Sequence, residues 1–178
     1  GSAPRSLAPA PSGRIWVVNK GASSISTVSP DTLTVAQTVA LPRASMPYGI
    51  VIGADGVAYV TLEATGQVLR IDANGAAGTP ATVAPHVRHL ALNAAGTQLL
   101  VARFVTPPLP GEATATVSPT ASTGAEVRVL TPSTLVQQRN IVLQNSTKAD
   151  NTVQGRGIPN YLGAPVISPD GRSAWVPS

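Results

Sequence analysis

Short runs of apolar and β-branched residues recur along the chain, and turn residues interrupt each run after a few positions. Typical runs occupy positions 15–18, 58–61 and 98–102. No segment keeps apolar residues at i, i+3, i+4 and i+7 over three turns, as a surface helix would need. The 17 prolines are spread along the chain, and proline is poorly tolerated inside helices and central strands. The pattern therefore predicts an all-β domain of short strands.

A turn that contains glycine precedes a β run at four places, which are Gly13, Gly56, Gly96 and Gly171. The first three glycines are 43 and 40 residues apart, and the longer interval before the last is consistent with an insertion. Three of the turns also follow a β run, at positions 49–52, 89–92 and 164–167. Glycine reaches positive φ at little cost, so each turn predicts a β-hairpin.

Two further runs follow each hairpin and predict the third and fourth strands of a repeating unit. Third strands are expected at 24–28, 67–71 and 126–130, and fourth strands at 35–41, 81–84 and 140–143. Four antiparallel strands in about 42 residues are typical of a β-propeller blade. We therefore predict an all-β fold, namely a β-propeller of four-stranded antiparallel blades, with about three to four blades present as a partial ring.

The repeats also set the expected organisation of the chain. Residues 1–11 are interpreted as an N-terminal tail or a preceding strand, and residues 12–178 as the partial propeller. Insertions are expected at about 105–125 and 145–162. A propeller typically needs 4–8 blades to close, and an open stack exposes strand edges and an apolar blade face. We therefore expect the remaining blades of a longer chain, or another copy of this chain, to close the ring.

The second repeat resembles a known family, the YVTN-type β-propellers of bacterial surface and periplasmic proteins. The family repeat carries P-x-G-[IV]-x-[IV]-x-x-D-G before [LA]-Y-V-T-N. Positions 47–56 and then 58–61 reproduce it, with Leu62 in place of the usual asparagine. The resemblance implies a β-propeller fold and leaves the function open, because propellers host many chemistries.

Three other segments, at 88–91, 103–107 and 160–165, look like parts of long bacterial propeller proteins, some of which are fused to di-haem cytochrome or peroxidase-like modules. No C-x-x-C-H haem site lies in this chain, because it contains no cysteine. No haem function therefore carries over to these residues, and no cofactor is predicted.

Composition narrows the partners and the compartment. The net charge is +4, but the ten arginines are scattered and no two are adjacent, so no nucleic-acid partner is expected. No run approaches the ~18 apolar residues of a membrane helix, so no membrane span is expected. The scarcity of lysine and the abundance of Ala, Thr, Ser and Pro favour an exported bacterial protein, which is periplasmic, secreted or on the cell surface.

Propeller geometry predicts that the loops before first strands and the loops after second strands share one face, here called the loop face. Both expected insertions fall on it, and long loops often carry function. The ligand-binding candidates on this face are Tyr48, His86, Arg88, His89, Arg103, Arg156 and Tyr161. We expect their ligand to be a protein or a small molecule.

The candidate residues leave several roles open. His86 and His89 are weak candidates for a metal site, because an i, i+3 pair in a strand points to opposite faces and no third ligand is near in sequence. Arg88 and Arg103 could bind an anionic ligand or pair with Glu63 or Glu126. Tyr48 and Tyr161, interpreted as equivalent positions before first strands, could stack on a ligand or cap a blade interface.

The leading hypothesis is a non-catalytic binding or scaffold module of an exported bacterial protein. The chain has few carboxylates, several of them in turns, and it lacks the G-x-S-x-G motif that activates a serine nucleophile. The alternative is the propeller domain of a larger redox enzyme, such as a di-haem peroxidase-like fusion, or of a lactonase-like hydrolase.

Overall fold

The computed structural model describes residues 2–106, 125–143 and 159–178. All regular secondary structure within these ranges is β-strand. The first sheet holds β1 (Pro4–Pro9), β2 (Ile15–Asn19), β3 (Ser24–Ser29) and β4 (Thr34–Ala40). The second sheet holds β5 (Pro47–Ile52), β6 (Ala58–Leu62), β7 (Gln67–Ile71) and β8 (Ala81–Thr82). The third sheet holds β9 (Val87–Leu92), β10 (Leu99–Arg103), β11 (Glu126–Leu130) and β12 (Gln137–Val142). A two-stranded sheet of β13 (Val166–Ile167) and β14 (Ala174–Trp175) follows.

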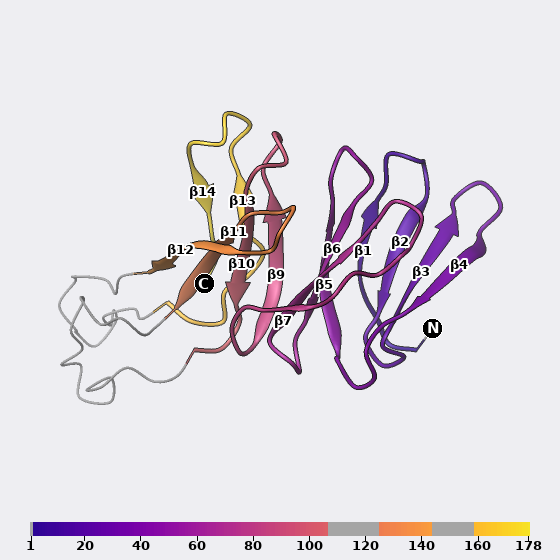
Figure 1. Cartoon of the computed structure of the whole chain (residues 1–178), viewed down its shortest axis with the longest axis horizontal. Coiled ribbons are helices and arrows are strands. Elements are labelled where there is room, and N and C mark those ends of the chain that lie inside the picture. The colour runs from indigo at the N-terminus through magenta and orange to yellow at the C-terminus, as the bar shows by residue number, and fades with distance from the viewer. Residues whose placement is uncertain (1, 107–124, 144–158) are drawn as a thin grey trace, which may run out of the picture.

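Each four-stranded sheet is one blade, in which strands that follow one another in the chain pair antiparallel. The blades stand side by side (Figure 1), and the first strand β5 contacts the first strands of both neighbouring blades, β1 and β9. The predicted fold class, a partial β-propeller of four-stranded antiparallel blades, is confirmed. Within the described ranges, no helix is long and apolar enough to cross a membrane.

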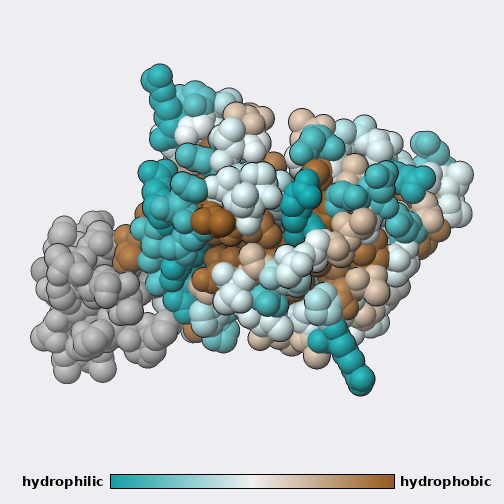
Figure 2. Space-filling model, viewed as in Figure 1, coloured by the Kyte–Doolittle hydropathy of each residue, from teal (hydrophilic) through white to brown (hydrophobic). Residues whose placement is uncertain are grey.

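Hydrophobic clusters fill the spaces between neighbouring blades. Alternate side chains of β6 enter different clusters: Ala58, Val60 and Leu62 pack with the first blade, whereas Tyr59 packs with the third. Every residue of β6 is therefore buried, as expected for a sheet that is covered on both faces. Figure 2 shows hydrophobic residues gathered between the sheets, with hydrophilic residues along much of the margin. Burial between blades, rather than inside any one blade, therefore holds the fold together.

The four turn glycines share one backbone geometry. Their φ angles are 80°, 79°, 67° and 70° for Gly13, Gly56, Gly96 and Gly171. Each glycine amide donates a hydrogen bond to the carbonyl three residues earlier, over 2.8–2.9 Å. Positive φ is the conformation that favours glycine, so these turns form as the sequence predicts.

A second backbone feature repeats where the chain enters each blade. Ala3, Met46, His86 and Tyr161 have φ angles of 51°, 49°, 60° and 52°. Each of these residues lies ten positions before the turn glycine of its blade, and each is exposed. Positive φ is uncommon for residues other than glycine. The four blades therefore share one entry bend, although a different side chain occupies it each time.

One hydroxyl joins the second blade to the third. The fully buried Thr61 side chain accepts a hydrogen bond from the Gly49 amide (2.8 Å) and donates one to the Arg88 carbonyl (2.7 Å). A Cβ placed on Gly49 would overlap that same carbonyl oxygen of Arg88. Gly49 therefore lets β5 and β9 approach each other closely, and Thr61 satisfies the polar groups that this approach buries.

Replacing Gly49 with alanine is expected to lower the free energy of unfolding by about 1–3 kcal/mol, because the added Cβ pushes against backbone that cannot rotate away. Urea unfolding followed by circular dichroism measures this loss. Gly78 is the matched control: a Cβ there would lie 3.4 Å from the nearest atom within 4 Å, which is ordinary contact. An equal loss in Gly49→Ala and Gly78→Ala would contradict the close-approach explanation.

Candidate functional site

The first strands bring one position of each complete blade together on the loop face. Arg5, Tyr48 and Arg88 are the second residues of β1, β5 and β9. The residue directly after each second strand lies at the same end, because the start of each first strand pairs with the end of its second strand. We call these six residues the axial cluster: Arg5, Lys20, Tyr48, Glu63, Arg88 and Phe104.

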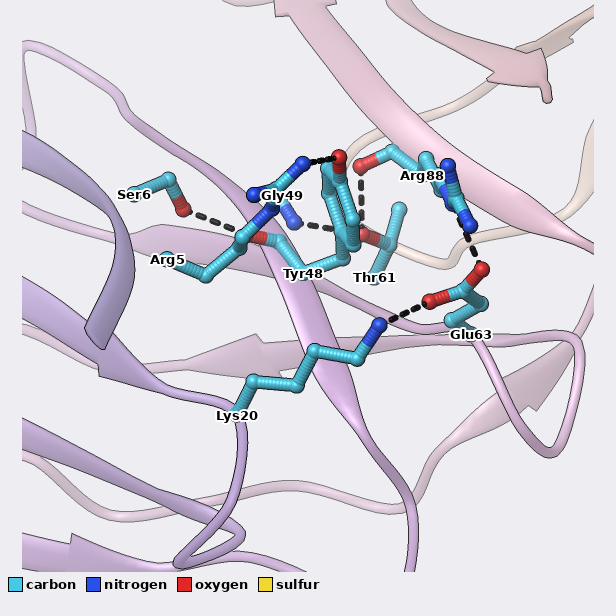
Figure 3. Close-up of polar contacts among 8 residues, drawn as sticks. All are labelled: Arg5, Ser6, Lys20, Tyr48, Gly49, Thr61, Glu63 and Arg88. Atoms are coloured by element: carbon cyan, nitrogen blue, oxygen red, sulfur yellow. Dashed lines mark hydrogen bonds and ion pairs between the residues drawn. The ribbon is translucent and has the colours of Figure 1, made fainter. Parts of the chain in front are cut away.

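Tyr48 lies at the centre of the axial cluster and is buried. The Arg5 guanidinium, the Lys20 ammonium and the Arg88 guanidinium lie 4.5, 5.0 and 4.8 Å from the centre of its ring (Figure 3). The Arg5 guanidinium also donates a hydrogen bond to the Tyr48 hydroxyl. The ring is thus an anchor for cations from the first and third blades, and it caps the blade interface.

Glu63 is the carboxylate of the axial cluster, and it links the first blade to the third. Lys20 Nζ lies 2.7 Å from Glu63 Oε2, and Arg88 Nε lies 2.5 Å from Glu63 Oε1. Burial raises the pKa of Glu63, but the hydrogen bonds from Lys20 and Arg88 outweigh burial, so this pKa lies below its ordinary 4.5. Glu63 is therefore ionised at neutral pH.

The Arg88 guanidinium contacts two aromatic rings. Its guanidinium carbon is 3.5 Å from the centre of the Phe104 ring and 4.8 Å from that of Tyr48. Phe104 in turn packs against Tyr161, with ring centres 5.3 Å apart. Stacking on planar rings fixes a guanidinium while leaving its edge available for hydrogen bonds.

A cavity of about 490 Å³ opens beside the axial cluster. Charged side chains of Lys20, Glu63 and Arg88 line part of it, and the exposed His86 contributes an imidazole. Met46, Ala64, Ala84 and Pro85 supply apolar wall, and Thr65 and Thr82 add hydroxyls. This volume and this mixture of apolar wall and a few polar groups are typical of sites for small molecules.

The two histidines occupy different environments. His89 is half-buried and its ring meets Tyr48 edge-on, with centres 5.2 Å apart. Burial, followed by the positive charges of Arg88 and Arg5, lowers the pKa of His89 below its ordinary 6.5. The imidazole is therefore neutral at neutral pH. Among the residues that the structure describes, no group of three His, Cys, Asp or Glu side chains is placed to hold a metal ion.

Arg103 is buried within the third blade, away from the cavity lining. Its guanidinium pairs with Glu126 (Nη1 to Oε1, 3.3 Å) and donates from Nε to the Pro85 carbonyl over 3.0 Å. The two arginine–carboxylate pairings that the sequence left open are thus Arg88 with Glu63 and Arg103 with Glu126. Arg156 lies outside the described residues.

The equivalence of Tyr48 and Tyr161 is wrong. Counted back from the turn glycines, Tyr161 corresponds to Met46 and His86, at the entry bend. Its side chain is 63% exposed, whereas that of Tyr48 is buried. The two-residue offset matters because the entry bend points outward and the second strand position points toward the neighbouring blades.

Sequence reasoning did not select Arg5, Lys20 or Phe104 as site residues. Arg5 was placed in a segment left undecided between tail and strand. Lys20 and Phe104 belong to no recognised motif, and they lie in two different repeats. Counting from the turn glycines aligns Lys20 with Glu63, because each comes seven residues after its glycine. It does not find Phe104, which comes eight residues after Gly96, because the pairing of β10 with β9 shifts register at Arg103.

Comparisons with known proteins bear on the fold. No protein-family model matches the chain, and no curated protein matches it. Among solved structures, a catalytically inactive virginiamycin B lyase from Staphylococcus aureus, solved with quinupristin, is similar with a TM-score of 0.67 and 14% identity, over 98% of this chain and 48% of that one. A functionally unknown protein from Desulfotomaculum acetoxidans is similar with a TM-score of 0.63 and 16% identity, over 100% and 50%.

A third solved structure, U3-55K, is similar with a TM-score of 0.64 and 14% identity, over 92% of this chain and 42% of that one. The chain thus spans about half the length of the structures it matches, or less. Identities this low show the fold alone. Together with the blades described above, they identify this chain as a β-propeller domain.

Proposed function

We propose that this propeller is a non-catalytic ligand-binding module, and that its ligand occupies the cavity on the loop face beside the axial cluster. The observation that carries the proposal is the cavity itself, where three blades place charged and apolar groups around one space. A ligand there would contact residues from all three complete blades. The way in which the blades pack against one another would therefore determine the shape of its site.

The chemistry of the cluster supports binding rather than catalysis. Both oxygens of Glu63 are engaged by cations, and its pKa is lowered, so it is a poor general acid or base near neutral pH. The YVTN-like repeat at 47–61, the scarcity of lysine and the abundance of Ala, Thr, Ser and Pro support an exported bacterial protein. We propose on these grounds that the module works in the periplasm or outside the cell.

A fragment screen by ligand-observed NMR tests this function. The library contains anionic, neutral and cationic compounds in equal numbers, and it is applied to the wild-type chain and to Thr65→Trp. Thr65 is exposed and lines the cavity, so the indole fills the space without entering the core. We expect fragments to bind the wild type. Their affinity for Thr65→Trp should be at least about tenfold lower, a loss of about 1.4 kcal/mol in binding free energy, because the indole occupies the space that they need.

The matched control is Ala95→Trp, in the exposed turn at the opposite end of the third blade. Binding that is unaffected by Thr65→Trp, or the absence of binding by any charge class, would refute the proposed site.

A further inference from the structure

We infer that the ligand of this cavity is an anion, and that Lys20 and Arg88 bind its carboxylate or phosphate group while Glu63 positions both cations. The inference rests on the proposed function and adds the chemical class of the ligand.

The axial cluster holds more positive than negative charge. Arg5, Lys20 and Arg88 surround one ring, and Glu63 is the only carboxylate in the cluster. His89 adds no charge at neutral pH, because its pKa is lowered. Positive groups gathered in a partly buried cleft raise the local concentration of anions. The site therefore favours an anionic ligand over a neutral or cationic one of the same shape.

The contacts of Arg88 leave donors for a ligand. Glu63 accepts from Nε of Arg88, and the guanidinium carbon lies over the rings of Phe104 and Tyr48. Among the described residues, no hydrogen bond from the two Nη groups of Arg88 is found. Those groups form the fork that matches a carboxylate or phosphate in two parallel hydrogen bonds. Both Arg88 and Lys20 line the cavity, so one anionic group there could reach both.

Glu63 acts as a positioning residue in this arrangement. It holds Lys20 Nζ at 2.7 Å and Arg88 Nε at 2.5 Å, and so it fixes cations from the first and third blades at one mouth. Its negative charge also opposes a second anion nearby. A glutamine of the same size has one acceptor oxygen where the carboxylate has two, so Glu63→Gln removes this charge and releases one of the two cations for the ligand. The variant should therefore strengthen anion binding.

The apolar wall indicates that the anionic group is attached to a carbon skeleton. Met46, Ala64, Ala84 and Pro85 line the same cavity as the two cations. Burying apolar surface against them adds affinity that inorganic phosphate cannot obtain. An organic carboxylate or phosphate ester therefore fits the site better than a bare inorganic anion.

Three matched probes test the charge class: benzoate, benzyl alcohol and benzylamine, which share a ring and differ in charge. Dissociation constants are measured by NMR titration of the full chain at low salt. We expect benzoate to bind at least about tenfold more tightly than benzyl alcohol, as charge-assisted hydrogen bonds require, and benzylamine to bind most weakly. Inorganic phosphate, lacking a ring, should bind more weakly than benzoate.

Variants then assign the preference to the named groups. Lys20→Gln and Arg88→Gln should each reduce the preference for benzoate by at least about threefold, and Glu63→Gln should increase benzoate affinity by about threefold, as expected when one charge near a surface site changes. The control is Arg14→Gln, an exposed arginine beside the turn glycine at the other end of the first blade. It should leave every dissociation constant unchanged, and circular dichroism verifies that each variant is folded.

The anion class is overturned if benzyl alcohol or benzylamine binds at least as tightly as benzoate. It is also overturned if the preference survives in both Lys20→Gln and Arg88→Gln, because another group would then supply it. A site that binds neutral fragments and loses them in Thr65→Trp keeps the proposed function and refutes only the charge class. Loss of all probe binding in the wild type refutes both.

Discussion

Replacing Glu126 with alanine is expected to lower the free energy of unfolding by about 3–5 kcal/mol, the range for breaking a buried ion pair by removing one partner. The side chains of Arg103 and Glu126 are only 7% and 4% exposed. Without the carboxylate, the Arg103 charge stays buried, and among the residues that the structure describes only the Pro85 carbonyl still accepts a hydrogen bond from it. Urea unfolding of the wild type and the variant measures the difference.

The matched control is Arg128→Ala. Arg128 pairs with the same carboxylate (Nη2 to Oε2, 2.6 Å), but its own side chain is 21% exposed. When Arg128 is removed, the buried Glu126 carboxylate still has Arg103 as its partner. We expect a loss of about 1 kcal/mol for this more exposed pair. The double replacement Arg103→Met with Glu126→Met should recover most of the lost stability, because it leaves no unpaired charge in the interior: Arg128 also loses its carboxylate, but its side chain reaches solvent. Equal losses in Glu126→Ala and Arg128→Ala would show that burial of Arg103 is not the cause.

Replacing Thr61 with valine should cost about 2–4 kcal/mol, because two buried backbone groups lose their partner at once. Valine keeps the shape of threonine and removes the hydroxyl that joins the Gly49 amide to the Arg88 carbonyl. Thr61→Ser keeps the hydroxyl and loses only a methyl group, so it should cost about 1 kcal/mol. The measurement is again urea unfolding.

Hydrogen exchange adds a local test of the same prediction. In Thr61→Val the Gly49 amide should exchange faster relative to the amides of β2, whereas in Thr61→Ser it should not. A serine variant that is as unstable as the valine variant would mean that packing of the methyl group, and not the hydroxyl, joins the second blade to the third.

The hairpins could be predicted because the chemistry that makes them is local. Gly56 reaches a φ of 79° at little cost, and the β runs on either side reveal which strands it joins. The segment at 4–9 was harder to assign. Two prolines bound it, and four of its six residues are exposed, so neither propensity nor alternation marks it as a strand. Its pairing with β2 decides the matter.

The axial cluster was only partly predictable, for a different reason. Arg88 and Tyr48 were candidates, and Glu63 was named as a partner for an arginine. Their convergence with Lys20 depends on contacts between β1, β5 and β9, which are far apart in the sequence. The sequence around a lysine that follows a strand does not reveal whether its side chain is exposed to solvent or binds a residue of a neighbouring blade. The spacing from the turn glycines gives Lys20 and Glu63 equivalent positions, and the register of each first strand against its second strand places both at the loop face.

The entry bend has a consequence for how such a module evolves. Alanine, methionine, histidine and tyrosine occupy the same left-handed backbone position in the four blades, and all four side chains point to solvent. The backbone thus tolerates any of these side chains at this position, and two of them, Met46 and His86, line the cavity that we propose as the binding site. Point mutations at the entry bend can therefore change which ligand the module binds without changing its backbone. Duplication of a blade adds one more such variable position.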